Sequence, residues 1–248
     1  MNFVRQEFLD HFCIVTLNKP EVKNAFDPFM IQEITQTFLD LNTNQEIKGI
    51  VLKGEGTAFC SGADLAWMKN MVNYTYEENI KDSNNLWKMF DAIKNVQHPV
   101  IAKVHGAVFG GALGILACCD YVVAEEKTKF CFSEVRLGLA PAVISSFILR
   151  KCADTFVRPY MLSAEVFSTA AAEKMGLVHQ IFSNQIEIKD FIQKLSANGA
   201  DGMRETKKLL NRLEASNLNE HQKITTDVIS RLRVSSEAQK RLQKFLGD

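Results

Sequence analysis

Short β-branched runs alternate with helix-like segments over the first three quarters of the chain, and this alternation constrains the fold most. Each run has the length and apolar composition of a buried strand. The runs are FCIVTL (12–17), GIVLKG (49–54), PVIAKV (99–104), YVVA (121–124) and LVHQIF (177–182). Asp27 is a good N-cap for a helix that begins at Pro28, and residues 76–96 predict another helix. The alternation predicts an α/β layered domain.

The last quarter of the chain has a different pattern. Strand signals end near residue 187, and helical segments are expected around 187–197, 202–214 and 219–246. Ser236 with Gln239 resembles a capping box within the last of these. A helical tail with apolar stripes can pack on its own domain or on a neighbouring subunit, and the pattern leaves both open.

Charge and cysteine content narrow the class of partner and compartment. Among 248 residues, 29 Lys and Arg balance 29 Asp and Glu, which favours a small-molecule partner over nucleic acid or a membrane surface. The six cysteines lack paired metal-ligand spacing, so we expect no metal and a reducing compartment. The N-terminal segment lacks the apolar region of a secretory signal, and a cytoplasmic location is expected.

Two glycine-containing turns follow predicted strands and could present backbone N–H groups. In AVFGGALGILACCD (107–120), Gly110 and Gly111 directly precede an apolar helix-like run, where first-turn N–H groups lack partners and the helix dipole is positive. In GTAFCSGADLAWM (56–68), Gly62 and Ala63 lie at a second such turn. Two N–H donors aimed at one oxygen would form an oxyanion hole, although a tight packing turn explains a glycine pair equally well.

Glu134 is the candidate acid–base residue, because it lies inside the largely apolar run FCFSEVRLGLAPAVIS (130–145). Burial raises the pKa of a carboxyl group toward the range that is useful for proton transfer. A surface pairing with Arg136 is the alternative interpretation. His105 and Cys60 lie near the two turns, and both are interpreted as structural residues, since a thiolate nucleophile would need an activating partner.

Four ordered stretches resemble the crotonase, or enoyl-CoA hydratase/isomerase, superfamily. They are LNKPEVKNAF, AFCSGADL, HGAVFGGALGILACCD and FCFSEVRLGLAP, and the resemblance extends from about residue 3 to 246. It implies a spiral of strand-strand-helix units over residues 1–190, with an acyl-CoA site. It further implies a helical oligomerisation region over 191–248 that forms a homotrimer or a dimer of trimers.

The resemblance also implies roles for individual residues. Glu134 would be the general acid/base, and the backbone N–H groups of Ala63 and Gly111 would hold the thioester oxygen. The CoA moiety of the substrate would be the only cofactor-like group. The residues expected to contact the substrate are Lys19, Lys23, Asn24, Ala25, Gly62, Asp64, Leu65, Trp67, Gly110, Gly114 and Pro141.

Gly114 departs from the hydratase pattern, which has a second glutamate at this position. A single glutamate could still hydrate a 2-enoyl-CoA by moving one proton from water to the α-carbon, or it could act as a delta-isomerase that shifts the double bond. The motifs look most like the methylglutaconyl-CoA hydratase branch of leucine breakdown, where Gly114 would leave space for a branched or carboxylated acyl group. A non-catalytic acyl-CoA binding protein is the alternative from another class.

Overall fold

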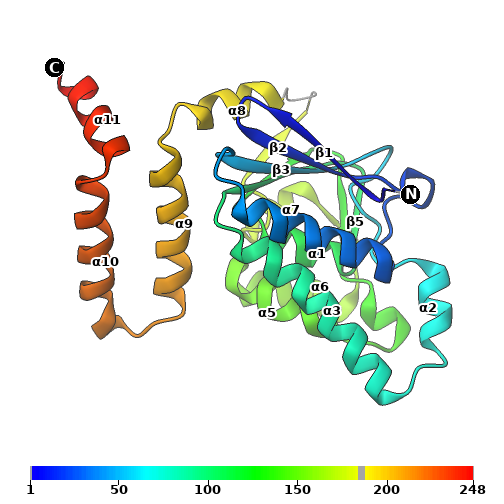
Figure 1. The fold of residues 1–248 in the computed structure, drawn as a ribbon. Helices are drawn as coiled ribbons and strands as arrows, with labels where there is room; N and C mark the ends of the chain where they lie inside the picture. The colour runs from blue at the N-terminus through cyan, green and yellow to red at the C-terminus, as the bar shows by residue number, and fades with distance from the viewer. Residues whose placement is uncertain (1, 184–187, 248) are drawn as a thin grey trace.

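A six-stranded sheet forms the centre of the computed structural model, which describes residues 2–183 and 188–247 (Figure 1). Its strand order is β1-β2-β3-β4-β6-β9, with β1 antiparallel to β2 and every other neighbouring pair parallel. The strands are β1 (Val4–Leu9), β2 (Phe12–Leu17), β3 (Gly49–Gly54), β4 (Val100–Val104), β6 (Tyr121–Glu125) and β9 (Gln180–Phe182). The predicted α/β class is therefore confirmed.

A second, three-stranded sheet lies beside the first and brings the two glycine turns together. It consists of β5 (Ala107–Phe109), β7 (Lys129–Cys131) and β8 (Phe167–Ser168). An isolated parallel bridge joins Cys60 to Val108. This bridge places the turn after β3 directly against the turn after β5, so that Gly62 lies beside Gly110.

Helices cover the faces of the sheets, and local capping sets where the main ones begin. In α1 (Pro28–Thr43), the Asp27 carboxylate accepts a hydrogen bond from the Met30 N–H (2.8 Å), as the sequence predicts. In α3 (Tyr76–Asn95), Thr75 and Glu78 form a capping box. The helices α1 and α3 pack against each other, and α3 also packs on α4 (Ala112–Cys118). This packing fixes the helix that follows the glycine pair.

The remaining helical elements lie between these strands and helices along the chain, and the last of them, α8, precedes the helical tail. They are η1 (Pro20–Val22), α2 (Leu65–Met71), η2 (Glu134–Leu137), α5 (Ala142–Lys151), α6 (Asp154–Ser163), α7 (Thr169–Lys174) and α8 (Ile188–Ser196). No helix within the described ranges is long and apolar enough to cross a bilayer.

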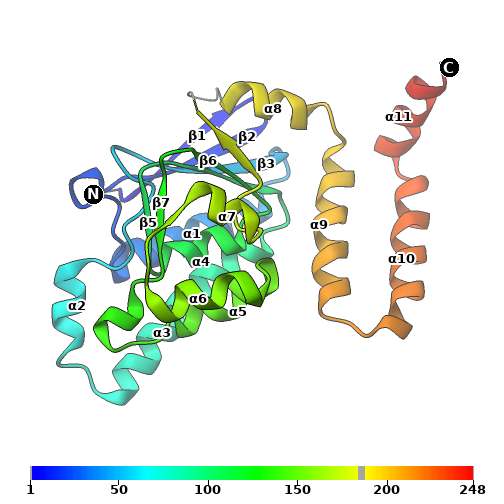
Figure 2. The same ribbon diagram turned by 180° about the vertical axis from the view of Figure 1, so that it is seen from behind.

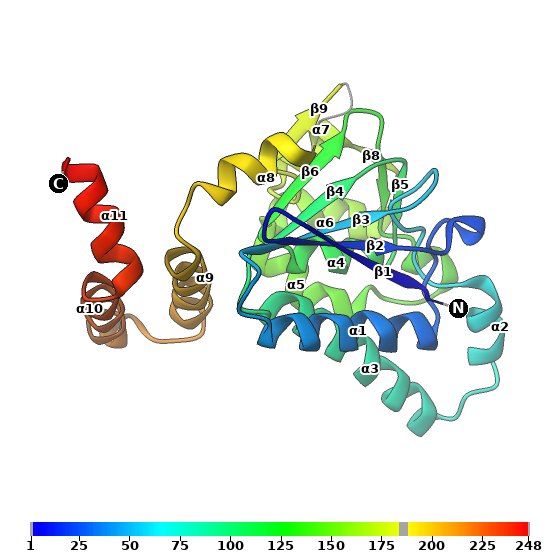
Figure 3. The same ribbon diagram turned by 45° about the horizontal axis from the view of Figure 1, so that its top comes forward.

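The tail consists of α9 (Ala200–Glu214), α10 (Leu218–Arg233) and α11 (Ser236–Leu246), which project to one side of the sheet-containing body (Figures 1 and 2). With the top of the molecule turned forward, α8 bridges the body and the tail (Figure 3). The single helix expected over 219–246 is wrong, because the chain breaks between α10 and α11. The predicted cap is displaced by one residue, since the Ser235 hydroxyl accepts the Ala238 N–H (3.2 Å).

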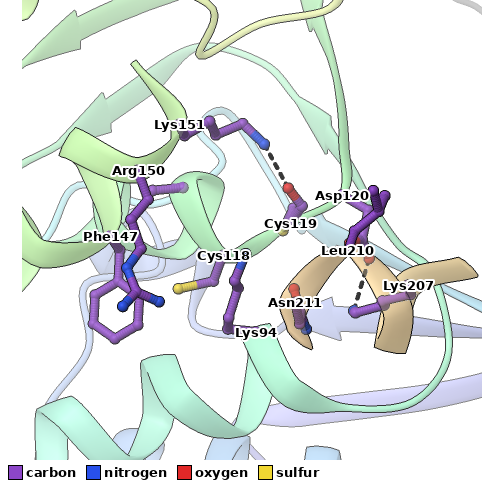
Figure 4. Close-up of a pocket in the computed structure, with 11 residues that line it drawn as sticks. Lys94, Cys118, Cys119, Asp120, Phe147, Arg150, Lys151, Lys207, Leu210 and Asn211 are labelled. Carbon is purple, nitrogen blue, oxygen red and sulfur yellow. Dashed lines mark hydrogen bonds and ion pairs between the residues drawn. The ribbon is translucent and has the colours of Figure 1, made fainter. Parts of the chain in front are cut away.

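An ion pair with a buried lysine fastens α9 to the body (Figure 4). The Lys207 ammonium donates to the Asp120 carboxylate (2.7 Å) and to the His98 carbonyl (3.0 Å). The same carboxylate oxygen accepts the Val100 N–H (2.7 Å), so one acidic side chain joins the segment after α4, strand β4 and helix α9.

Candidate active site

A cavity of about 420 Å³ lies where α2, α3, α4 and the η2–α5 segment meet. It is lined by Ala63 and Gly111, the residues predicted to supply the N–H donors, and by Glu134, the predicted acid–base residue. Its lining residues are Phe26, Ala63, Trp67, Met71, Asn79, Asp82, Ser83, Leu86, Gly111, Glu134, Leu139, Ala140, Pro141, Ala142, Val143 and Ile144. The three residues proposed for chemistry are thus brought to one apolar cavity from three distant parts of the chain.

The backbone at Ala63 is held with its N–H free. Phe26 N–H donates to the Gly62 carbonyl (2.8 Å), and Asp64 N–H donates to the Phe26 carbonyl (2.9 Å). The intervening Ala63 N–H has no partner among the described residues. Gly62 has φ +92°, and a Cβ there would lie 2.6 Å from the Phe109 carbonyl oxygen, so only glycine fits this close approach.

The second donor comes from the start of α4. Gly110 adopts φ +53°, and its N–H donates to the Cys131 carbonyl (2.9 Å). Gly111 follows as the N-cap of α4, and its N–H has no partner within the described part of the chain. A Cβ at Gly111 would lie 2.7 Å from Phe26 Cζ, so the Phe26 ring packs against Gly111. The backbone of Phe26 holds the segment that carries Ala63, the other donor.

Glu134 is the first residue of η2 and lies against the glycine pair. A Cβ at Gly110 would be 3.5 Å from Glu134 Oε1. Glu134 Oε2 is buried and has no hydrogen-bond partner in the described structure. Burial raises the pKa of Glu134 above its ordinary value. The alternative pairing with Arg136 is not formed, because that guanidinium donates to the Ala164 carbonyl.

Together these groups define the chemistry that the cavity can perform. Two unpartnered N–H groups, one of them at a helix N-terminus, favour an oxygen that gains negative charge. A desolvated carboxylate beside them can accept and return a proton. Trp67, Leu86 and Ile144 provide apolar surface that would exclude water from an acyl chain.

The side chains of Lys19 and Asn24 have partners within the protein, and the contacts of these two residues with CoA stay predictions. Lys19 is buried, and its ammonium pairs with Asp27 (2.9 Å) and with Asp64 (3.8 Å). The Asn24 side chain is fully buried and donates to three carbonyl groups, those of residues 55, 58 and 59. Both side chains are committed to the fold, and they position the loop that carries Ala63.

The other predicted substrate contacts divide into two groups. Pro141 and Trp67 line the cavity, and Gly62 and Gly110 support its donors. The others do not line the cavity: Lys23 and Leu65 are exposed, and Ala25 is buried elsewhere. The Asp64 carboxylate caps α2 by accepting hydrogen bonds from the Ala66 and Trp67 N–H groups. A contact of Lys23 with CoA phosphates stays a prediction.

Gly114 does not leave space beside the acyl chain, and that prediction is wrong. The residue is buried in α4 and does not line the cavity. A Cβ there would lie 2.6 Å from Ile144 Cγ2 and 2.8 Å from Phe90 Cζ. These two side chains occupy the room that the sequence interpretation assigned to substrate.

The sequence does not predict one wall of the cavity. Asn79, Asp82, Ser83 and Leu86 lie at intervals of three and four along α3 and therefore share one helix face. Their spacing indicates a face, but the sequence does not indicate that this face meets α2 and α5. Phe26 was missed for the same reason, because its role depends on contacts with the two glycine turns.

The two residues interpreted as structural have structural contacts. His105 Nε2 lies 2.9 Å from the Gly56 carbonyl oxygen. Burial raises the pKa of the Cys60 thiol to about 12, which keeps the thiol protonated at neutral pH. Neither residue lines the cavity.

Solved structures define the class of this fold. An enoyl-CoA hydratase from Shewanella pealeana superposes with a TM-score of 0.91 at 34% identity, covering 99% of this chain and 93% of that one. AtuE from Pseudomonas aeruginosa, with a TM-score of 0.94 at 22% identity, covers 98% and 96% and supports the fold alone. The architecture is that of the crotonases.

The sequence profile of the enoyl-CoA hydratase/isomerase family matches residues 7–247, and the chain belongs to this family. A Thermus thermophilus homologue in the enoyl-CoA hydratase group is 30% identical over 81% of this chain and 80% of its own length. The enoyl-CoA hydratase AKT6-1 of Alternaria alternata is 33% identical over 73% of this chain, and the match spans 59% of that protein.

Proposed function

We propose that the protein hydrates a 2-enoyl-CoA thioester, with Glu134 as the single acid–base residue. The observation that carries this proposal is that Glu134 lines the same cavity as Ala63 and Gly111. Glu134 Oε2 is buried without a partner in the described structure, and the N–H groups of Ala63 and Gly111 have no partner among the described residues. Family membership supports a thioester as the substrate class.

In the proposed reaction, Glu134 accepts a proton from water while the water oxygen bonds to the β-carbon of the enoyl group. The electrons of the double bond move toward the thioester oxygen, where the two N–H groups stabilise the developing charge. Glu134 then returns the proton to the α-carbon. The product is a 3-hydroxyacyl-CoA, and the carboxylate is regenerated.

Delta-isomerisation is a second candidate, and the packing at Gly114 supports it. Phe90 and Ile144 fill the space beside α4 where the hydratase pattern has a second glutamate. One carboxylate can take a proton from one carbon of an enoyl-CoA and return it two positions away without using water.

The acyl group is a separate question. Because Ile144 and Phe90 fill the space at Gly114, this glycine gives no support for a branched or carboxylated acyl group. A role in leucine breakdown, with 3-methylglutaconyl-CoA as substrate, stays a prediction, and turnover of that ester beside crotonyl-CoA tests it.

The variant Glu134→Gln tests the catalytic role. Turnover of crotonyl-CoA should fall about 100- to 10,000-fold, while the Kd for butyryl-CoA changes only a few-fold. Glu173→Gln, an exposed change in α7 outside the cavity, is the matched control. A wild-type protein that binds butyryl-CoA but turns over no enoyl-CoA would support the acyl-CoA binding protein instead.

We further propose that residues 191–248 mediate self-association as a homotrimer or a dimer of trimers. Leu218, Val234 and Phe245 expose 82%, 79% and 87% of their surface in the single chain, which leaves a large apolar area uncovered. Sedimentation equilibrium should give three or six chains, and a monomer at micromolar concentration would contradict this proposal.

We also propose a reducing compartment, such as the cytoplasm, as the location of the protein. All six cysteines are free and buried, which fits a compartment that keeps thiols reduced. Fractionation of cells that produce the protein would test this location.

A further inference from the structure

A second pocket lies where the C-terminal ends of α3, α4 and α5 meet α9 (Figure 4). It has a volume of about 190 Å³ and shares no lining residue with the cavity that contains Glu134. Among the described residues, one carboxylate lines this pocket, that of Asp120, and four cationic side chains line it, those of Lys94, Arg150, Lys151 and Lys207. The proposed reaction uses none of these groups.

The acidic partners do not neutralise these cations. The Asp120 carboxylate is engaged by Lys207 at 2.7 Å. The Glu214 carboxylate is shared between Lys94 (3.5 Å) and Arg150 (3.8 Å), and both distances exceed an ordinary hydrogen bond. Within the described part of the chain, two carboxylates therefore face four cations, and an excess of two positive charges remains around the pocket.

Lys151 has the least compensated charge of the four. Its ammonium donates to the Cys119 carbonyl, and no carboxylate of residues 2–183 and 188–247 forms an ion pair with it. Burial lowers the pKa of Lys151, because its charge is poorly solvated. The negative end of the α4 dipole accounts for the contact with Cys119. An ammonium has three N–H donors, however, so two of them stay without a partner.

The donors and the size of the pocket indicate the class of ligand. The planar guanidinium of Arg150 and the ammonium groups of Lys94 and Lys151 suit the oxygens of an oxyanion. Pockets for drug-sized ligands measure about 300–1,000 Å³, so a pocket of about 190 Å³ holds a smaller group. A phosphate dianion matches both this size and the excess of two positive charges, whereas a carboxylate would supply one negative charge.

We propose that Lys94, Arg150 and Lys151 form a binding site for a phosphate dianion, either inorganic phosphate or the phosphate group of a small monoester. Asn211 of α9 lines the same pocket, and its side-chain amide can donate to the anion. The bound anion would thus join α3 and α5 to the helical tail. The proposal is independent of the proposed function, since it requires neither a CoA ester nor turnover.

Calorimetric titration with sodium phosphate tests the site, at constant ionic strength in chloride and at about pH 8, where phosphate is mainly a dianion. The wild-type protein should bind about one phosphate per chain, at least about tenfold more tightly than acetate. Glycerol 3-phosphate distinguishes the two sources of the anion. Tighter binding of this ester than of inorganic phosphate would assign the site to a monoester, and weaker binding would assign it to free phosphate.

Variants locate the bound anion. Lys151→Met and Arg150→Gln should each weaken phosphate binding about tenfold or more, because each removes a charge-assisted hydrogen bond. The Arg150 side chain is 57% exposed, so Arg150→Gln keeps the test open if Lys151→Met fails to fold without its bond to Cys119. Lys88→Met, at an exposed position of α3 outside the pocket, is the matched control and should keep the wild-type Kd.

Three results would overturn the proposal. They are a wild-type protein that binds no phosphate at millimolar concentration, equal affinity for phosphate and acetate, and a folded Arg150→Gln variant that binds phosphate as tightly as Lys88→Met. None of these results bears on the proposed function, which hydration of crotonyl-CoA in phosphate-free buffer tests separately.

Discussion

Replacing Gly62 with alanine should separate the two N–H donors of the candidate oxyanion hole. Gly62 has φ +92°, where an alanine side chain costs about 1 to 2 kcal/mol in backbone strain. The new Cβ would lie 2.6 Å from the Phe109 carbonyl oxygen, and a backbone atom cannot move aside as a flexible side chain can. The turn carrying Ala63 must therefore shift away from the turn carrying Gly111.

The shift has a calculable consequence for catalysis. Loss of one oxyanion-hole donor typically lowers kcat about 100- to 1,000-fold, which corresponds to roughly 3 to 4 kcal/mol. We expect a loss of that order for Gly62→Ala with crotonyl-CoA, measured at a temperature where the variant is folded by circular dichroism. The Kd for butyryl-CoA should change less than kcat, because the charge develops mainly in the transition state.

Gly176→Ala is the matched control. Gly176 has φ +88° and also faces a carbonyl oxygen, that of Lys151 at 3.1 Å, but it does not line the cavity. The control change should lower the melting temperature without lowering kcat in the folded protein. If Gly62→Ala folds and retains kcat within about threefold of wild type, the assignment of Ala63 N–H as a donor is refuted.

Three further changes test other parts of the structure. Gly114→Glu should destabilise the fold by about 3 kcal/mol or more, because its Cβ would overlap Ile144. It should not increase the rate of enoyl-CoA hydration. A variant that melts at the wild-type temperature and hydrates the substrate faster would contradict this. Lys207→Met should lower the free energy of unfolding in urea by about 2 to 3 kcal/mol, because it leaves Asp120 unpaired. The control Lys208→Met should lower it by less than about 0.5 kcal/mol, and equal effects of the two changes would refute the role of the ion pair. Burial and the nearby positive charge of Arg204 lower the pKa of His98 from 6.5 to about 4, so the unfolded state binds more protons between these pH values. The free energy of unfolding should therefore fall by about 3 kcal/mol as the pH drops from 6.5 to 4. His98→Leu should flatten this pH dependence, and an unchanged slope would exclude His98 as its source.

Local signals explain which elements the sequence predicts well. Asp27, Pro28 and a helical apolar repeat predict α1, because capping and periodicity agree within one segment. The run GIVLKG predicts β3 at its observed bounds. The three-residue strands β5 and β7 were not predicted, since each is defined by its neighbour in the sheet rather than by its own composition.

The candidate site shows the same division. The sequence singles out Gly111 and Glu134 as candidates, because a glycine pair before a helix and a carboxylate in an apolar run are local patterns, and the family resemblance assigns their roles. It does not identify the Lys19 ion pairs or the packing around Gly114, which depend on residues that meet only in the folded chain. Asp82 belongs to this second group, since only the fold places it in one cavity with Trp67.

The most direct test of the central claim is proton NMR of crotonyl-CoA with wild-type protein and Glu134→Gln in deuterated water. The proposed mechanism predicts 3-hydroxybutyryl-CoA with deuterium at the α-carbon from wild type, and at least about 100-fold less product from the variant. Equal rates of hydration by both proteins, or no product from wild type under conditions where it binds butyryl-CoA, would contradict the claim.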